Sequence, residues 1–149
     1  MSAIEPDLQL HLYRSQCIDA FVAVETAIIT LCKKLCPGHD GEILSQRTKR
    51  LRGLSATSAY SKAQRTQLHA ALDELDDLLP IRNDIVHGGL TVVRQDQHHV
   101  AVFINVREAT SIAPSARLLS RDHLQKVSQA ATRLAAQLDK LLTKPASQT

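Results

Sequence analysis

Aromatic side chains are scarce in this 149-residue chain, which has two Phe, two Tyr and no Trp. Large aromatic side chains dominate many protein cores and interfaces, so this core must be built mainly from Leu, Ile, Val and Ala. Aromatic rings are also the platforms on which proteins stack the bases of single-stranded nucleic acids. Their scarcity excludes such a platform as the main means of binding RNA or DNA.

Other scarcities bear on membrane and secreted classes of protein. No uninterrupted apolar run reaches the ~18 residues that span a bilayer. The N-terminal region carries Glu5 and Asp7 without a basic flank, unlike a signal peptide. The three cysteines are odd in number, and without a secretory signal they indicate reduced thiols. We therefore expect a cytoplasmic protein that contacts no membrane.

The charge balance is mild. The chain carries 18 Lys and Arg against 15 Asp and Glu, which gives a net charge of +3. Its 44% hydrophobic and 22% charged residues are ordinary for one globular domain, here expected to cover residues 1–149. This charge permits a polyanionic partner such as RNA but does not demand one.

Apolar residues spaced by three and four predict amphipathic helices. The predicted helices are 7–36, 41–52, 61–79, 80–88 and 120–143, followed by a polar tail at 144–149. Ser61 and Gln64 form a capping box, and Ser120 is placed to cap the last helix. The predicted buried stripe of the first helix is Leu10, Tyr13, Cys17, Phe21, Val24, Ile28, Leu31 and Leu35. That of the last helix is Leu124, Val127, Ala131, Leu134, Leu138 and Leu141.

Residues 90–106 change to the alternating pattern of strands. Thr91-Val92-Val93 is expected to pair with the alternating run 100–106 across a polar turn. Residues 108–119, around Pro114, are predicted to be a loop. The predicted fold class is therefore all-α: an antiparallel four- or five-helix bundle with a β-hairpin inserted before the last helix.

A short segment, 80–88, brings together a cation, an amide and an imidazole. Pro80 is placed at its start and two glycines at its end, as favoured at the first position and just past the end of a helix. Asn83 and His87 are four residues apart and share one face of such a helix. Arg82 lies beside them and completes an R-N-x-x-x-H pattern. The bare Arg and His spacing recurs at Arg94 and His99, but without the Asn.

With Leu78-Leu79 before it and Ile85-Val86 inside it, this segment resembles the R-x4-6-H motif of the HEPN superfamily. The resemblance implies a helical bundle and a symmetric dimer in which two motifs face each other. It also implies metal-independent cleavage of RNA in toxin–antitoxin, antiviral defence or RNA-processing systems, with no cofactor. Its implied partners are RNA, a second copy of the chain, and a neutralising antitoxin or regulator. Other members have lost activity and serve as binding or regulatory modules.

The residue types suit that chemistry. His can donate or accept a proton near neutral pH, so His87 is a candidate acid or base. Arg82 can bind phosphate through two parallel N–H groups and keeps its charge. Asn83 would orient His87 or bind a phosphate oxygen. Because one chain supplies one motif histidine, a full acid–base pair would combine His87 of two chains.

Two carboxylates are candidates to support the motif. Glu25, the only charge between Asp19 and Lys33, is either an edge residue in water or a partner of Arg82 or His87. Asp84 either pairs with Arg82 or faces water. In an alternative reading, Arg82, Asn83 and His87 form a structural hydrogen-bonded network, and the protein is a catalytically inactive binding module.

Two further groups of residues have both a functional and a structural interpretation. The basic segment, which we define as Arg47, Lys49, Arg50 and Arg52, is either a solvated helix face or an RNA-binding patch. Cys32, Cys36 and His39 have a spacing that fits no familiar zinc module. We therefore interpret the cysteines as buried thiols and predict no metal site.

Overall fold

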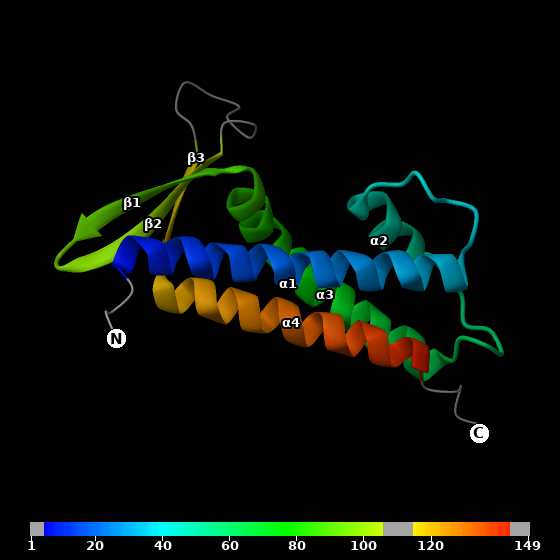
Figure 1. Ribbon diagram of the computed structural model, residues 1–149. Helices are drawn as coiled ribbons and strands as arrows, with labels where there is room; N and C mark the ends of the chain where they lie inside the picture. The colour runs from blue at the N-terminus through cyan, green and yellow to red at the C-terminus, as the bar shows by residue number, and fades with distance from the viewer. Residues whose placement is uncertain (1–4, 106–114, 144–149) are drawn as a thin grey trace.

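The computed structural model describes residues 5–105 and 115–143 (Figure 1). Within these residues the chain forms four helices and three strands. In chain order they are α1 (Pro6–Leu35), α2 (Leu44–Arg52), α3 (Lys62–His87), β1 (Gly89–Gln95), β2 (His98–Asn105), β3 (Ser115–Ser120) and α4 (Arg121–Thr143). The strands form one antiparallel sheet in the order β1-β2-β3. The predicted all-α fold class is therefore wrong, because the fold is a mixed one of helices and a sheet.

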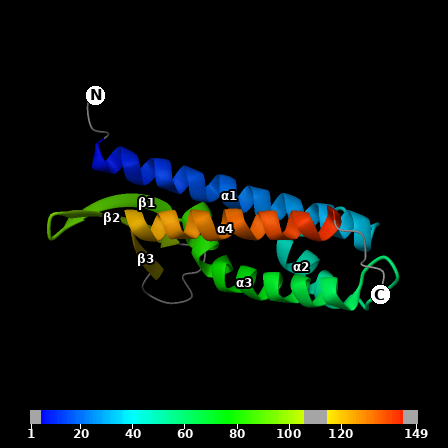
Figure 2. The ribbon, with the colours of Figure 1, turned by 90° about the horizontal axis from the view of Figure 1, so that it is seen from below.

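The three long helices pack lengthwise around an aliphatic core. Figures 1 and 2 show α1 and α4 side by side and running in the same direction, with α3 opposed to both. The Cys17 Sγ of α1 donates to the Leu124 carbonyl at the start of α4. Gln64 at the start of α3 donates to the Leu141 carbonyl near the end of α4. A fully antiparallel bundle is thus also wrong, because α3 returns the chain to the end of the molecule where α1 begins and α4 starts from that same end.

The predicted helical stripes form most of the core. In α1 the buried members are Leu10, Cys17, Phe21, Val24, Ile28 and Leu31, and in α4 they are Leu124, Val127, Ala131, Leu134 and Leu138. The stripe residues Tyr13, Leu35 and Leu141 are partly buried at the edge of this core. Fully burying one large aliphatic side chain contributes about 1.5–3 kcal/mol, so these stripes hold α1 against α4.

The predicted hairpin is present, but the sheet has a third strand. β1 and β2 pair with Leu90 opposite Phe103, across a turn in which Asp96 and Gln97 have φ of 46° and 68°. Two successive positive φ values are those of the tight turns that suit hairpin twist. β3 pairs with β2, so the loop predicted at 108–119 is wrong from 115 onward, and the rest lies outside the described residues. Leu118 and Leu119 are adjacent apolar residues, so this segment lacks the apolar–polar alternation that predicts a strand. It forms a strand because it pairs with β2.

α3 continues through Pro80 to His87, so the two helices predicted at 61–79 and 80–88 are a single helix. A proline inside a helix removes one backbone hydrogen bond and costs about 3 kcal/mol. Leu75 before Pro80 and Ile85 after it are both buried, and this packing holds both parts of the helix against the core. The predicted capping box at the start of α3 is confirmed, because Ser61 Oγ accepts from the Gln64 backbone and the Gln64 side chain accepts in return.

α1 is the one helix among the described residues that is long and apolar enough to cross a membrane, with a mean hydropathy of 1.5 over 18 residues. Length and composition alone are weak evidence that α1 crosses a membrane, because core helices of soluble proteins pass the same test. In this fold 44% of that stretch is buried.

Candidate functional site

Arg82 is the centre of a polar cluster at the contact between α1 and α3. Its Nε and Nη2 atoms both donate to Oε1 of Glu25, with Nε at 3.1 Å. Its Nη1 atom donates to Oδ1 of Asn83 at 3.1 Å and lies 3.5 Å from Nε2 of His87. The structure thus brings together the three predicted catalytic residues and adds Glu25 as a paired carboxylate.

The cluster remains open on one side. The Arg82 side chain is 19% exposed and that of Glu25 is 32% exposed, while His87 lies on the surface. Because a guanidinium only donates hydrogen bonds, its contact with Nε2 suits the neutral tautomer of His87 that carries its proton on Nδ1. A solvent-borne anion can therefore reach a cation and an imidazole at the same place.

Asp84 is buried beneath the motif and pairs with the sheet. Both predicted alternatives for Asp84 are wrong, because Oδ2 accepts from Nε of Arg117 in β3. The Asn105 side chain of β2 lies 3.4 Å from Asp84 Oδ1 and 3.5 Å from the Asn83 carbonyl. A buried carboxylate needs such partners, and these contacts fix the turn of α3 that carries Asn83.

Arg14 of α1 holds the end of the motif helix. Its Nε donates to the Ile85 carbonyl at 3.1 Å and its Nη2 to the Gly88 carbonyl at 3.0 Å. The guanidinium carbon lies 5.8 Å from the centre of the Phe103 ring. The last carbonyls of a helix lack partners within it and attract cations, so Arg14 stabilises the turn that presents His87.

Gly88 is required at this position by close packing. Its φ is −77°, which is not in the left-handed region. A Cβ at Gly88 would lie 2.3 Å from the Asp84 carbonyl oxygen and 3.3 Å from the Phe103 Cβ. The absent side chain thus lets the chain leave α3 beside the sheet.

A cleft of about 500 Å³ opens next to Arg82. It is lined by Glu25 and Ile29 of α1, Ile43 and Ser45 around the start of α2, and Leu79 and Arg82 of α3. Its walls combine aliphatic side chains with carboxylate, hydroxyl and amide groups and with the guanidinium groups of Arg47 and Arg82. Its volume is within the range of small-ligand sites, and its lining is more polar than theirs usually is.

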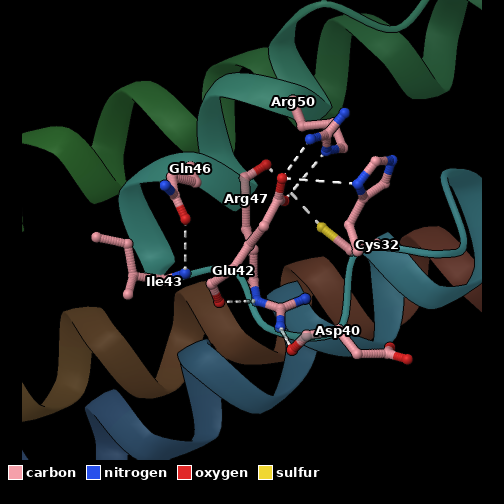
Figure 3. A network of polar contacts seen from close by, with 8 residues as sticks. Cys32, Asp40, Glu42, Ile43, Gln46, Arg47 and Arg50 are labelled. Carbon is pink, nitrogen blue, oxygen red and sulfur yellow. Dashed lines mark hydrogen bonds and ion pairs between the residues drawn. The ribbon is translucent and has the colours of Figure 1, made fainter.

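The basic segment is less available than its sequence suggests. Arg47 is buried, and Figure 3 shows its guanidinium pointing back toward the loop before α2. Its Nε donates to the Glu42 carbonyl at 2.8 Å and its Nη2 to the Asp40 carbonyl at 2.7 Å. Arg47 therefore organises the connection between α1 and α2 and does not face solvent.

The other cations of the basic segment lie nearer the surface. Arg50 pairs with the Glu42 carboxylate, which holds the pKa of that carboxyl below its usual value. Arg52 donates to Asp73 at 2.8 Å and to Asp76 at 2.7 Å. Lys49 is exposed. Three of the four predicted RNA-binding residues thus have partners within the chain.

All three cysteines are free thiols, and the prediction that they are buried is confirmed for Cys17 and Cys32 but wrong for Cys36, which is half-buried. Cys17 and Cys32 are buried, and burial raises the pKa of each thiol to about 11. Both are therefore protonated near neutral pH. Within the part of the chain that the structure describes, no three His, Cys, Asp or Glu side chains gather as a metal ion requires.

Arg14, Asn105 and Arg117 were not predicted as part of this site. Each comes from an element remote in sequence, and no local spacing links them to Asn83 or Asp84. The one available signal was that Asn105 is a polar residue within an apolar alternating strand. No protein-family model, curated protein or solved structure matches this chain.

Proposed function

We propose that this protein is a metal-independent endoribonuclease that uses Arg82, Asn83 and His87. The observation that carries the proposal is the contact of the Arg82 guanidinium with both Asn83 and His87 on an open side of α3. These side chains provide a proton-transfer group and a fixed positive charge within about one and a half turns of helix. Both are what phosphodiester cleavage requires.

In the proposed reaction, the 2′-hydroxyl of RNA attacks the adjacent phosphorus. A base removes the 2′-hydroxyl proton as the new P–O bond forms, and an acid protonates the departing 5′-oxygen as its bond breaks. Arg82 stabilises the negative charge of the phosphorane between these steps. The products are a 2′,3′-cyclic phosphate and a free 5′-hydroxyl.

A second copy of the chain would complete the acid–base pair with its own His87. An apolar stripe on α1 supports this arrangement, because Ile18, Val22 and Ile29 flank Glu25 on one helix face. Val22 is 55% exposed, and the other two are partly exposed. The opposed directions of α1 and α3 place Ile18 and Val22 level with the motif, where a two-fold axis would bury them.

One observation favours a binding module as the second candidate function. Glu25 accepts from Nε and Nη2 of Arg82, which form one edge of the guanidinium that can grip a phosphate with two parallel hydrogen bonds. In a silent module this pair would be permanent and would serve only to join α1 to α3. The two candidates therefore differ in whether RNA is cut.

The test is cleavage of end-labelled single-stranded and hairpin RNAs by purified protein in the presence of EDTA. We expect cleavage that survives the chelator and products with 2′,3′-cyclic phosphate ends. His87→Ala should lose cleavage while keeping the melting temperature of the wild type. Absence of cleavage by the wild type, together with unfolding or dissociation of His87→Ala, would support the binding module.

A further inference from the structure

We propose that the cleft beside Arg82 binds the nucleobase next to the scissile phosphate and prefers bases that carry an amino group. This inference rests on the proposed function, because it takes Arg82 as the phosphate-binding residue. The cleft is continuous with the motif, since Arg82 and Asn83 form part of its lining. A phosphate held at Arg82 therefore has its attached nucleoside within reach of the cleft.

The wall of the cleft formed by the start of α2 is held in place by the loop before it. Figure 3 shows Arg47 reaching back to the carbonyls of Asp40 and Glu42. The side chain of Gln46 also accepts from the Ile43 backbone N–H at 3.1 Å. These bonds fix the loop before any ligand arrives, which lowers the ordering cost of binding.

The volume and apolar walls suit a nucleobase. About 500 Å³ lies within the range of small-molecule sites. Ile29 and Leu79 offer aliphatic contact on the α1 and α3 sides, and Ile43 stands at the rim, where it is 65% exposed. Flat bases can pack against aliphatic side chains, which compensates here for the scarcity of aromatic residues.

The polar groups of the cleft indicate which bases are preferred. Glu25 and Glu42 both line it, and ionised carboxylates only accept hydrogen bonds. Glu25 accepts two hydrogen bonds from Arg82 on one oxygen, and Glu42 accepts one from Arg50 on each of its oxygens. A carboxylate has about four acceptor positions, so acceptor capacity remains. Adenine, cytosine and guanine carry amino groups that can donate to them. Uracil has a ring N–H donor but no amino group, and it presents two carbonyl oxygens that the carboxylates would repel.

Binding of the four nucleoside 3′-monophosphates tests the proposal, measured by calorimetry and by NMR shifts of residues 43–46. We expect the adenine, cytosine and guanine nucleotides to bind roughly tenfold or more tightly than the uracil nucleotide, the usual worth of a hydrogen bond to a charged group. Inorganic phosphate should bind more weakly than any amino-bearing nucleotide. Glu42→Gln adds N–H donors and should shift the preference toward the uracil nucleotide.

Ser45→Phe fills the cleft from an exposed position in the first turn of α2 and should abolish nucleotide binding. The matched control is Ser55→Phe, on an exposed loop outside the cleft, which should bind as the wild type does. Equal binding of all four nucleotides, or binding unaffected by Ser45→Phe, would overturn the base site even if RNA is cleaved. Selective nucleotide binding without any RNA cleavage would uphold the site and reject the nuclease.

Discussion

One carboxylate oxygen of Glu25 accepts hydrogen bonds from both Nε and Nη2 of Arg82, although the two residues are 57 positions apart in the sequence. This pair fixes the plane of the guanidinium across the contact between α1 and α3. The remaining nitrogen, Nη1, then faces Asn83 and His87. Under the proposed function, Glu25 is a positioning residue that also reduces the attraction of Arg82 for a phosphate before the reaction.

Replacing Glu25 should therefore have opposite effects on RNA binding and on the positioning of the Arg82 guanidinium. Glu25→Gln should bind RNA more tightly, because a negative charge is removed, and should lower kcat by roughly 10- to 100-fold, because the guanidinium is less firmly held. Steady-state cleavage kinetics that resolve kcat from KM measure both effects. Glu74→Gln is the control, since Glu74 pairs with Arg133 elsewhere on the surface. A Glu25→Gln enzyme that cuts faster would show that Glu25 competes with substrate instead.

Two substitutions in the motif probe proton transfer and charge stabilisation. His87→Ala should slow cleavage by roughly 10²–10⁴-fold, the usual contribution of a positioned acid or base. Arg82→Ala should lose a comparable factor, and Arg82→Lys should recover only part, because an ammonium cannot replace the planar fork. Single-turnover cleavage rates measure these losses. Circular dichroism must show unchanged melting temperatures, since loss of rate through unfolding would favour a structural network.

Dimerisation is predicted through the α1 face that contains Val22. We expect the wild type to sediment as a dimer at tens of micromolar, a concentration at which contacts of about −6 kcal/mol are half formed. Val22→Glu should produce a folded monomer that no longer cuts RNA, because the second His87 is removed. Val93→Glu is the matched control, since Val93 is also exposed but lies on the sheet. A wild-type monomer with full activity would rule out a composite site.

Different positions in the basic segment should have different effects. Arg47→Ala leaves the Asp40 and Glu42 carbonyls without their partner and should destabilise the protein by about 1–3 kcal/mol. Lys49→Ala should change stability by less than about 0.5 kcal/mol, as exposed substitutions usually do. Urea denaturation measures both. If the segment binds RNA, Lys49→Glu should also weaken binding and flatten its salt dependence.

Gly88→Ala should destabilise the fold through overpacking. Its Cβ would lie 2.3 Å from the Asp84 carbonyl oxygen of α3 itself, so the backbone at the end of α3 must change its conformation. We expect a loss of about 1–3 kcal/mol in the free energy of unfolding. Gly89→Ala is the neighbouring control, because a Cβ there meets nothing within 4 Å. Equal stability of the two variants in urea would refute this packing argument.

The sequence alone identified α1, α4 and the grouping of the motif residues because these depend on local patterns. A stripe with steps of three and four residues predicts which face of α1 or α4 is buried, whatever surrounds it. Capping residues act within one turn, which is why the pairing of Ser61 with Gln64 could be predicted. The cation, amide and imidazole of the motif were visible for the same reason, since they lie within six residues.

Tertiary structure decided the features that join distant segments. The alternating run predicted a hairpin, but β3 exists only because β2 offers it a pairing edge. Pro80 is a local signal for a break, yet burial of Leu75 and Ile85 on either side keeps α3 continuous. The sequence left both Glu25 and Asp84 with two alternatives. Packing of α1 against α3 pairs Glu25 with Arg82, and packing of the sheet against α3 pairs Asp84 with Arg117. Each pairing follows because a carboxylate removed from water needs the nearest available cation.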